Sequence, residues 1–438
     1  MLHHEDTDAA EVLSPARPAG HTNPTPGSGP MSTDTHSLTI GVVREKRAGE
    51  DRVAMTPAGL ASLLKAGAKV LIERGAGHAA GFSDEAYADK GAEIVSREQA
   101  LAARVLLRVQ VDEDAVADTH PGQIVIGLAA PLAGTPTVSA LAERGATLFA
   151  MELVPRTTRA QAMDVLSSQA NIAGYKAVLL AAGALPKMYP LLTTAAGTIA
   201  PAKVLIVGAG VAGLSAIATA RRLGALVEAY DVRPAVKEEV ESLGARFVEL
   251  PLETDQEGGG SGAYAQQLSD EQLQKQRELL AKTVANSDVV ITTAQVQGAK
   301  APVIVTTDMV SMMSPGSVIV DLAAEQGGNC ELTVAGETVD HGGVKVIGPI
   351  NLPATIPTHA SLMYAKNVAN LVQLMLREGS VDVDVDDDVV RDTLVTREGE
   401  IVHPRVREVF GLAPKAVPAA AAPPAPAASE SGPEEVAS

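Results

Sequence analysis

The chain has 438 residues, 46% of them apolar, which is long enough for two or three domains with substantial cores. Its net charge of −18 disfavours nucleic acid and anionic lipid as direct partners, because both are themselves negatively charged. With a single cysteine, Cys330, the chain cannot form an internal disulfide, and we interpret this residue as buried and without a chemical role. No apolar run reaches the roughly 18 to 20 residues that span a bilayer, so we expect no direct membrane insertion.

Both ends of the chain have the composition of flexible extensions. Residues 1–35 are rich in Pro, Gly, Thr, Asp and His and lack the basic start and apolar middle of a signal peptide. Residues 413–438 are rich in Ala and Pro and end acidic. We expect a disordered N-terminal extension and a disordered tail, neither of which carries chemistry.

The region that follows the N-terminal extension alternates strand-like and helical runs. Helices are expected at 57–66 and 136–145. The strand-like runs around them are 38–43, 69–73, 104–109, 124–128 and 147–151. This alternation is typical of a parallel-sheet α/β domain.

A polar cluster follows at the start of an otherwise apolar helix, predicted over residues 160–185. Its members are Arg156, Gln161, Asp164 and Ser167. Spacings of three place the last three of these side chains along one helical face, where they could meet one ligand. The same residues also fit a solvated helix start, with Thr158 as the cap, and both interpretations stay open at this point.

Residues 203–233 form the pattern of a dinucleotide-binding unit. An apolar strand from Val204 to Val207 is followed by three glycines at G-x-G-x-x-G spacing, namely Gly208, Gly210 and Gly213. These glycines permit a tight turn, a close approach of backbone to a pyrophosphate, and close packing of the next helix on the strand. The pattern predicts a second α/β domain that binds a dinucleotide.

The type of dinucleotide is indicated by the end of the next strand. This strand, from Leu226 to Tyr230, leads into Asp231, 18 residues beyond Gly213. A carboxylate there can accept hydrogen bonds from a ribose 2′-hydroxyl, which favours NAD over NADP. Arg233 could meet a 2′-phosphate, but repulsion from Asp231 should dominate.

Residues 253–270 interrupt the second domain with four glycines between positions 258 and 262, followed by one tyrosine, Tyr264. So much backbone freedom does not suit a packed element. The segment fits either a mobile lid or an ordinary surface insertion.

Later runs complete the predicted architecture. Strands are expected near 288–293, 317–322 and 344–348, and a second long helix at 359–377. We predict an α/β fold of two Rossmann-like parallel-sheet domains joined by two long helices, with a cleft between them. The predicted domains are a first domain of 36–160 and 355–412 and an NAD-binding Rossmann domain of 161–354.

The aspartates at 382, 384 and 386 imitate the start of a calcium loop, but Asp387 stands where glycine is needed and Thr393 where glutamate is. We interpret this run as a solvated acidic edge. The histidines are scattered singly, so no metal site is predicted.

Four of these segments together resemble the NAD(H)-binding component of proton-translocating nicotinamide nucleotide transhydrogenases. They are RVAMTPAG at 52–59, the Arg156–Gln161–Asp164 run, GAGVAG at 208–213 and VIVDLAAEQGGNCE at 318–331. The resemblance runs from about Leu38 to Phe410. It implies that the polar run, with Ser167, surrounds the nicotinamide.

The same resemblance implies further cofactor contacts. These are Val211, Asp231, Val232, Arg233, Tyr264 on a loop that closes over the cofactor, Gln276 and Gln295. Two positions depart from the family pattern, because Ala263 stands where glycine is usual before the tyrosine and Gln295 replaces a common leucine.

Alanine dehydrogenases share this fold and supply the competing hypothesis. Oxidative deamination needs groups that bind a carboxylate and move protons. Arg52 and Glu325 survive from that family's site, but Gln110 stands at its substrate lysine and Ala130 at its histidine. An amino-acid substrate is therefore disfavoured, and a non-catalytic NAD-binding module is the other alternative.

Hydride exchange between two nicotinamides needs close approach and exclusion of water instead of an acid or base. The resemblance thus implies an NAD(P)⁺ transhydrogenase subunit that holds NADH while hydride passes to NADP⁺ on a separate subunit. It further implies proton translocation by membrane-spanning subunits, a homodimer, and a place on the cytoplasmic face of the membrane through those partners. In this interpretation Asp164 orients the ring, Gln161 bridges toward the second nucleotide and Arg156 clamps the cofactor.

Overall fold

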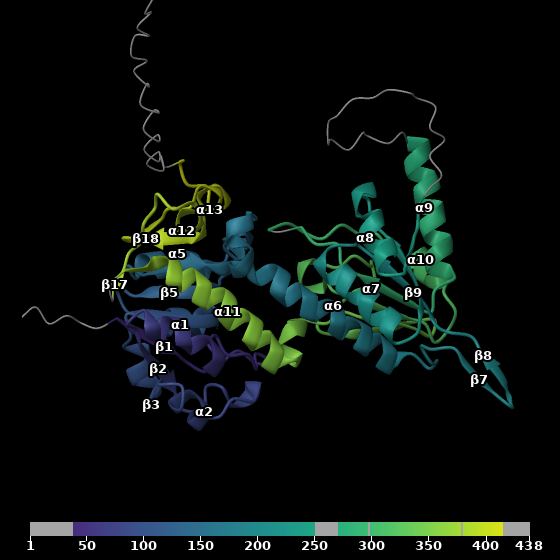
Figure 1. The fold of residues 1–438 in the computed structure, drawn as a ribbon. Helices are drawn as coiled ribbons and strands as arrows, with labels where there is room; N and C mark the ends of the chain where they lie inside the picture. The colour runs from purple at the N-terminus through teal and green to yellow at the C-terminus, as the bar shows by residue number, and fades with distance from the viewer. Residues whose placement is uncertain (1–37, 250–269, 297, 378–379, 415–438) are drawn as a thin grey trace, which may run out of the picture. The chain divides into compact units, whose positions relative to one another are not determined.

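The computed structural model describes residues 38–249, 270–296, 298–377 and 380–414. Two large α/β sheets account for most of these residues (Figure 1). Each sheet has its own apolar clusters on both faces. The predicted α/β fold class is therefore confirmed.

The first sheet has eight strands in the order β19-β18-β6-β5-β4-β1-β2-β3. Its six parallel strands are β1 Thr39–Val42, β2 Lys69–Glu73, β3 Glu93–Val95, β4 Val105–Gln110, β5 Ile124–Leu128 and β6 Thr147–Ala150. Two antiparallel strands from the end of the chain, β18 Leu394–Arg397 and β19 Glu400–Ile401, extend the sheet beyond β6. The five strands expected from the sequence all lie in this sheet, within two residues of their predicted ends.

Short helices connect and cover these strands. They are η1 Pro57–Gly59, α1 Leu60–Lys65, η2 His78–Ala80, α2 Asp84–Ala88, α3 Arg97–Leu101, α4 Glu113–Asp118, η3 Pro131–Ala133, α5 Pro136–Glu143, η4 Met151–Leu153, α12 Asp388–Thr393 and α13 Pro404–Val409. The apolar side chains of the strands alternate between two clusters, so that both faces of the sheet are buried, as a parallel sheet requires.

The second sheet has seven strands in the order β11-β10-β9-β12-β13-β15-β14. Its strands are β9 Lys203–Val207, β10 Leu226–Tyr230, β11 Arg246–Phe247, β12 Val289–Thr292, β13 Val318–Asp321, β14 Thr338–His341 and β15 Val344–Ile347. All pairs are parallel except β14 with β15. Because the strand order reverses between β9 and β12, ligands of such sheets bind at the carboxyl ends of these two strands.

The helices of this sheet are α7 Val211–Arg222, η6 Pro234–Val236, α8 Lys237–Ser242, α9 Asp270–Ala285, α10 Thr307–Ser311, η7 Ala324–Gln326 and η8 Leu352–Thr355. Two small antiparallel pairs complete the described elements, β7 Leu192–Thr194 with β8 Gly197–Ile199 and β16 Leu376–Arg377 with β17 Ser380–Val381. The β7–β8 hairpin is exposed along its whole length and extends away from the second sheet (Figure 1).

Two long helices pack on each other, and one of them, α6, contributes to the cores of both sheets (Figure 1). The helix α6, Val165–Ala184, buries Val165 in a first-sheet cluster and Ala177, Val178 and Ala181 in a second-sheet cluster. The helix α11, Pro357–Met375, buries most of its apolar face against the first sheet. The helix α6 thus contributes to both cores, and the polar cluster lies at its amino-terminal end.

Candidate functional site

The glycine turn after β9 is shaped for the close approach of a ligand. Gly208 has φ +99°, a backbone conformation that favours glycine. A Cβ on Gly213 would lie 1.8 Å from the carbonyl oxygen of Gly208, so α7 packs against the turn more closely than any side chain allows. A Cβ on Gly210, by contrast, would have no atom within 4 Å. The turn therefore leaves open space at Gly210, beside the amino-terminal end of α7, which attracts anions.

Thr293 supports this turn from the neighbouring strand. Its hydroxyl donates to the carbonyl of Gly208 at 3.0 Å, and its amide donates to the carbonyl of Val207 at 2.8 Å. Thr293 was not predicted from the sequence, although its place directly after a buried strand, where the strand order of the sheet reverses, is a usable signal.

Asp231 lies at the end of β10 and closes the turn. One carboxylate oxygen accepts the amide of Ala209 at 2.8 Å, and the other accepts the amide of Arg233 at 2.8 Å. The Arg233 guanidinium adds hydrogen bonds of 3.0 Å to both oxygens. Burial by itself would raise the pKa of Asp231, but these hydrogen bonds outweigh it and hold the pKa below its usual value.

This pairing bears on the choice of nucleotide. The Arg233 side chain is engaged by Asp231, so its charge is already neutralised where a 2′-phosphate would need it. Four donors fill the lone pairs of the carboxylate, so a ribose hydroxyl can reach it only by displacing one of them. Arg233 is the donor that can move, because its side chain is 60% exposed and exposed ion pairs are weak.

The other expected cofactor contacts occupy varied positions. Val211 and Val232 are exposed, and Gln276 lies half-buried on α9. Gln295 follows β12 and donates its side-chain amide to the carbonyl of Leu322 at 2.5 Å. Tyr264 and the glycine-rich segment lie outside the described residues, apart from position 270 at the start of α9.

The polar cluster differs from the sequence prediction. The helix α6 begins at Val165 instead of residue 160, and Gln161 lies in the 3-10 turn η5, Thr158–Met163. Gln161, Asp164 and Ser167 therefore do not share one helical face, and that prediction was wrong. The physical reason is that Asp164 has an extended backbone and caps α6, with its carboxylate accepting the amide of Ser167 at 2.9 Å and its hydroxyl at 2.6 Å.

The predicted cap, Thr158, makes no such bond, because η5 begins after Thr157 without a side-chain cap. Within the turn, Ala160 and Met163 are buried in the first-sheet core, and Arg156 and Gln161 are exposed. The loop 155–164 is thus held by apolar residues while its polar side chains remain accessible to a ligand.

The distance between the glycine turn and the polar loop follows from the packing of α6 on α7. A Cβ on Gly174 would lie 2.0 Å from the carbonyl oxygen of Ala212, which fixes the contact of α6 with the first turn of α7. Asp164 precedes Gly174 by ten residues, about 15 Å along the α6 axis. A ligand at the glycine turn must therefore be elongated to reach the loop 155–164.

Arg52 occupies the corresponding switch point of the first sheet, between β1 and β4. It is 3% exposed, and its guanidinium donates to both carboxylate oxygens of Glu50, at 2.7 and 2.6 Å. It also donates to Gln169 on α6 at 2.8 Å and to Asn351 at 2.9 Å. All of these partners belong to the chain itself, so the guanidinium is already satisfied.

The residues at the lysine and histidine positions of alanine dehydrogenases play structural roles. Gln110 donates its side-chain amide to Glu50 at 3.3 Å. Ala130 has φ +46° and donates its backbone amide to Glu152. Neither side chain can accept or deliver a proton.

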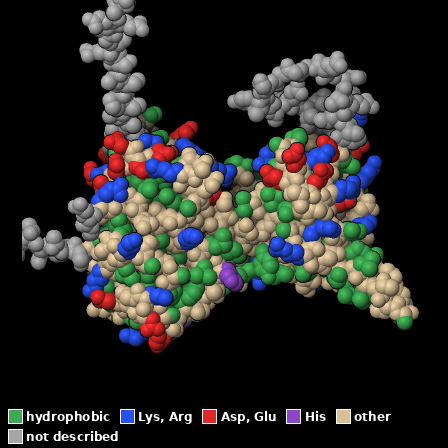
Figure 2. All heavy atoms as spheres, viewed as in Figure 1, with side chains coloured by type: hydrophobic (Ala, Val, Ile, Leu, Met, Phe, Trp, Pro, Cys, Tyr) green, Lys and Arg blue, Asp and Glu red, His purple; other side chains and the backbone are tan. Residues whose placement is uncertain are grey.

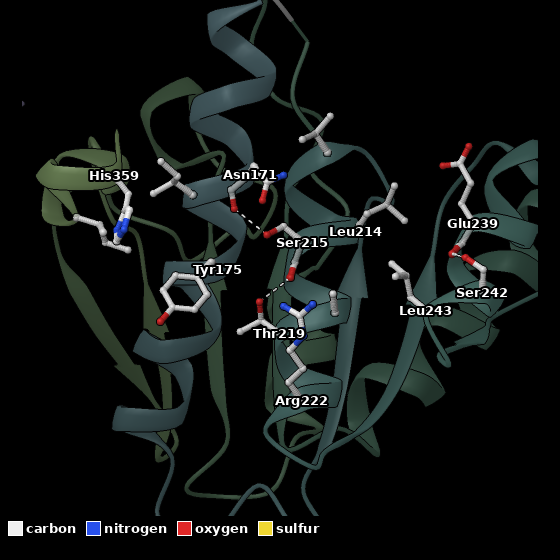
Figure 3. Close-up of a pocket in the computed structure, with 14 residues that line it drawn as sticks. Asn171, Tyr175, Leu214, Ser215, Thr219, Arg222, Glu239, Ser242, Leu243 and His359 are labelled. Atoms are coloured by element: carbon white, nitrogen blue, oxygen red, sulfur yellow. Dashed lines mark hydrogen bonds between the residues drawn. The ribbon is translucent and has the colours of Figure 1, made fainter. Parts of the chain in front are cut away.

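A surface groove of about 830 Å³ lies along α6, α7 and α8 (Figure 3). Tyr175 and His359 face it from one side, and Arg222 and Glu239 from the other. Of the candidate cofactor contacts it includes Val211 but none of the three glycines. In Figure 2, acidic side chains gather over α12, α13 and α8, and the surface over α6 and α11 shows few of them.

Metal and thiol chemistry find no support in the described ranges of the chain. Among these residues, no group of three His, Cys, Asp or Glu side chains could hold a metal ion. Cys330 is buried as expected, and burial raises the pKa of its thiol to about 11. No helix in the described ranges is long and apolar enough to cross a membrane.

Comparison with known proteins places both sheets in one family. Residues 41–173 match the family described as alanine dehydrogenase/PNT, N-terminal domain, and residues 177–404 match its C-terminal domain. The chain is 44% identical to a Rhodospirillum rubrum polypeptide named as the first portion of NAD(P) transhydrogenase subunit alpha, over 84% of this chain and 98% of that protein.

Solved structures give the same result. The transhydrogenase of Sinorhizobium meliloti has a TM-score of 0.77 and 41% identity, over 83% of this chain and all of that one. An L-alanine dehydrogenase has a TM-score of 0.72 and 26% identity, over 85% of this chain and 99% of that one.

Proposed function

The chain belongs to the alanine dehydrogenase/PNT family, and on that premise we propose that it is the NAD(H)-binding subunit of a proton-translocating transhydrogenase. It is an enzyme subunit, and it binds NAD(H). Hydride passes from this NADH to NADP⁺ on a separate subunit, and membrane subunits couple the transfer to proton translocation. The name of the Rhodospirillum rubrum relative, one portion of a divided subunit alpha, supports the need for partner polypeptides.

The residues present fit the nucleotide. Open space at Gly210 and the amino terminus of α7 suit a pyrophosphate, and Asp231 suits an adenosine ribose once Arg233 moves aside. The loop 155–164 then receives the nicotinamide end, about 15 Å away along α6.

The pair Gln110 and Ala130 is the main reason to prefer hydride transfer between nucleotides over oxidation of an amino acid. A dehydrogenase that oxidises an amino acid must remove protons, and these two side chains cannot. Arg52 adds support, because a substrate carboxylate would have to displace Glu50, Gln169 or Asn351 from its guanidinium. Transfer between two nicotinamides moves a hydride and needs no such groups.

The role of the protein in this reaction is to hold the cofactor and orient it toward the arriving nucleotide. The Asp164 carboxylate is fixed by the amide and hydroxyl of Ser167, so it presents a constant acceptor at the amino terminus of α6. Arg156 and Gln161 are exposed on the same loop and are available to the cofactor and to the arriving nucleotide. Orientation of this kind increases the rate of hydride transfer, because it brings the reacting groups close together in the right geometry.

We extend the proposal to the organisation of the protein. Residues 36–160 with 355–412 would form one domain and 161–354 the NAD-binding domain, between which the cofactor lies. The chain would act as a homodimer on the cytoplasmic face of the membrane, held there by its partner subunits.

The test mixes the purified chain with a separately prepared NADP(H)-binding partner domain and follows reduction of an NADP⁺ analogue by NADH. Transfer that depends on both proteins supports the proposal. Turnover of alanine or pyruvate by this chain alone, without transfer in the mixture, would overturn it.

Asp164→Asn separates the proposed role from helix capping. Asparagine caps helices as well as aspartate, so the stability should hold while the transfer rate falls by about tenfold or more. The matched control is Asp112→Asn, the same exchange at the cap of α4, where Asp112 accepts the amide of Ala115 at 3.1 Å. This control should retain full transfer.

A further inference from the structure

We propose that Arg159 is a positioning residue that fixes the loop 155–164 for hydride transfer through the carboxylates of Asp387 and Asp388, an inference that rests on the proposed function. Arg159 lies between the exposed Arg156 and Gln161 in this loop. Its partner Asp387 lies 228 residues later in the chain, and Asp388 follows it at the start of α12.

The ion pair is built on a fixed carboxylate. One Arg159 Nη2 atom contacts Oδ1 of Asp387 and lies 3.0 Å from Oδ1 of Asp388. The same Asp387 oxygen caps α12 by accepting the amides of Val389 at 2.9 Å and Val390 at 3.2 Å. Because Asp387 is tied to the helix and its side chain is only 19% exposed, it gives the arginine a stationary partner.

The electrostatics of Asp387 agree with this geometry. Burial would raise its pKa, but the Arg159 guanidinium and the two backbone amides outweigh burial and lower the pKa. The carboxylate is therefore charged at neutral pH and available to the arginine. Asp387 adjoins the aspartate run interpreted as a solvated acidic edge, and its pairing with Arg159 was not predicted from the sequence.

The second half of the loop has separate anchors on α11. The carbonyl of Ala162 accepts the side-chain amides of Asn367 and Asn370, both at 2.9 Å. Ala160 and Met163 are buried in the first-sheet core.

The first half depends on Arg159. Among the described residues, the hydrogen bonds of Pro155 to Thr158 stay within the loop, and Arg159 makes the side-chain bonds that tie this half to another element. Loss of Arg159 would therefore free Arg156 and its neighbours while Asp164 stays in place as the cap of α6.

Three variants test the ion pair. Arg159→Ala removes the cation, and Arg159→Lys keeps a charge. Asp387→Asn removes the less exposed of the two anions, leaves Asp388 in place and still caps α12. Arg397→Ala is the matched control, because Arg397, at the end of β18, is also a partly exposed arginine and is paired with a carboxylate, Glu398 at 3.3 Å. Exposed ion pairs add little to global stability, so the melting temperature of each variant should change by no more than a few degrees.

Three measurements are made on the full chain. Amide hydrogen exchange in residues 155–164 should rise in Arg159→Ala and Asp387→Asn and stay unchanged in Arg397→Ala. The hydride-transfer rate with the partner domain should fall by about tenfold in both, since small displacements of reacting groups have effects of this size or larger. Arg159→Lys should recover much of the rate, and NADH affinity should change less than twofold.

The double variant, with Arg159→Ala and Asp387→Asn together, should be no slower than Arg159→Ala alone, because Arg159→Ala already removes the contact that Asp387→Asn weakens. Unchanged exchange and rate in Arg159→Ala would overturn the inference, as would additive losses in the double variant. Absence of transfer by the unmodified chain would instead overturn the proposed function, and hydrogen exchange would still decide whether Arg159 fixes the loop.

Discussion

Replacing Gly210 by alanine should separate cofactor binding from folding. The residue has φ −79° and ψ −167°, which alanine adopts freely, and the added Cβ would have no protein atom within 4 Å. The folded chain should therefore be as stable as before, or more stable by about 0.4 to 1 kcal/mol because the unfolded chain loses freedom. If a pyrophosphate lies against this turn, however, the methyl group occupies its place.

The expected loss of affinity follows from the cost of crowding. Overpacking by a methyl group costs about 1 to 3 kcal/mol, which corresponds to a dissociation constant for NADH roughly 5- to 150-fold weaker. The assay is titration of NADH by its own fluorescence, which is clean here because the chain has no tryptophan. Thermal unfolding of the same samples gives the stability.

Gly213→Ala is the matched comparison in the same turn. Its Cβ would lie 1.8 Å from the carbonyl oxygen of Gly208, so the backbone of α7 must shift and stability should fall by about 1 to 3 kcal/mol. If Gly210→Ala binds NADH as tightly as the unmodified chain, the pyrophosphate does not lie against this turn. If it loses as much stability as Gly213→Ala, the space at Gly210 is not open.

Three further predictions concern packing, cofactor choice and pH. Gly174→Ala should destabilise the chain by about 1 to 3 kcal/mol in urea unfolding, because its Cβ would lie 2.0 Å from the Ala212 carbonyl oxygen. The control, Gly183→Ala in the same helix, has open space around its Cβ and should stabilise the chain by about 0.5 to 1 kcal/mol. Asp231→Ala should weaken NADH binding about tenfold and release Arg233, so that the NADPH-to-NADH affinity ratio rises in parallel titrations; an unchanged ratio would contradict the role of Asp231. Burial raises the pKa of Glu45 from 4.5 to about 7, so the folded chain binds this proton more tightly than the unfolded chain. The contribution of this proton to the free energy of unfolding is complete below about pH 4.5 and is lost as the pH rises to about 7. Unfolding midpoints at pH 5 and 8 should therefore differ less in Glu45→Gln than in the unmodified chain, and an equal difference would show that Glu45 does not titrate there.

Much of the fold could be predicted from the sequence because its signals are local. Buried parallel strands are short apolar runs, and the glycine spacing and Asp231 identify the switch point of the second sheet without any long-range information. The edge strand β14 was missed because it is exposed or half-buried along its length. The strand β18 was missed because it pairs with a strand far earlier in the chain.

The sequence indicated which residues lie near the site, but not the backbone conformation that positions them or the distant residues that hold them. Asp164 followed by Ser167 is a recognisable cap signal, yet the polar run was extended into the helix, and η5 was missed. The bonds of Arg159 to Asp387 and of Arg52 to Asn351 join residues 228 and 299 positions apart. No periodicity or spacing encodes such pairs, because only the tertiary fold brings them together.

The proposed function includes the claim that hydride moves directly from one nicotinamide to another that a different subunit delivers. The direct test uses NADH deuterated at both C4 positions, this chain, and the NADP(H)-binding partner domain in ordinary water. One deuterium per turnover should appear in the NADPH formed, without exchange into solvent. Deuterium lost to water, or recovered in an amino or hydroxy acid when alanine or pyruvate is present, would contradict the claim.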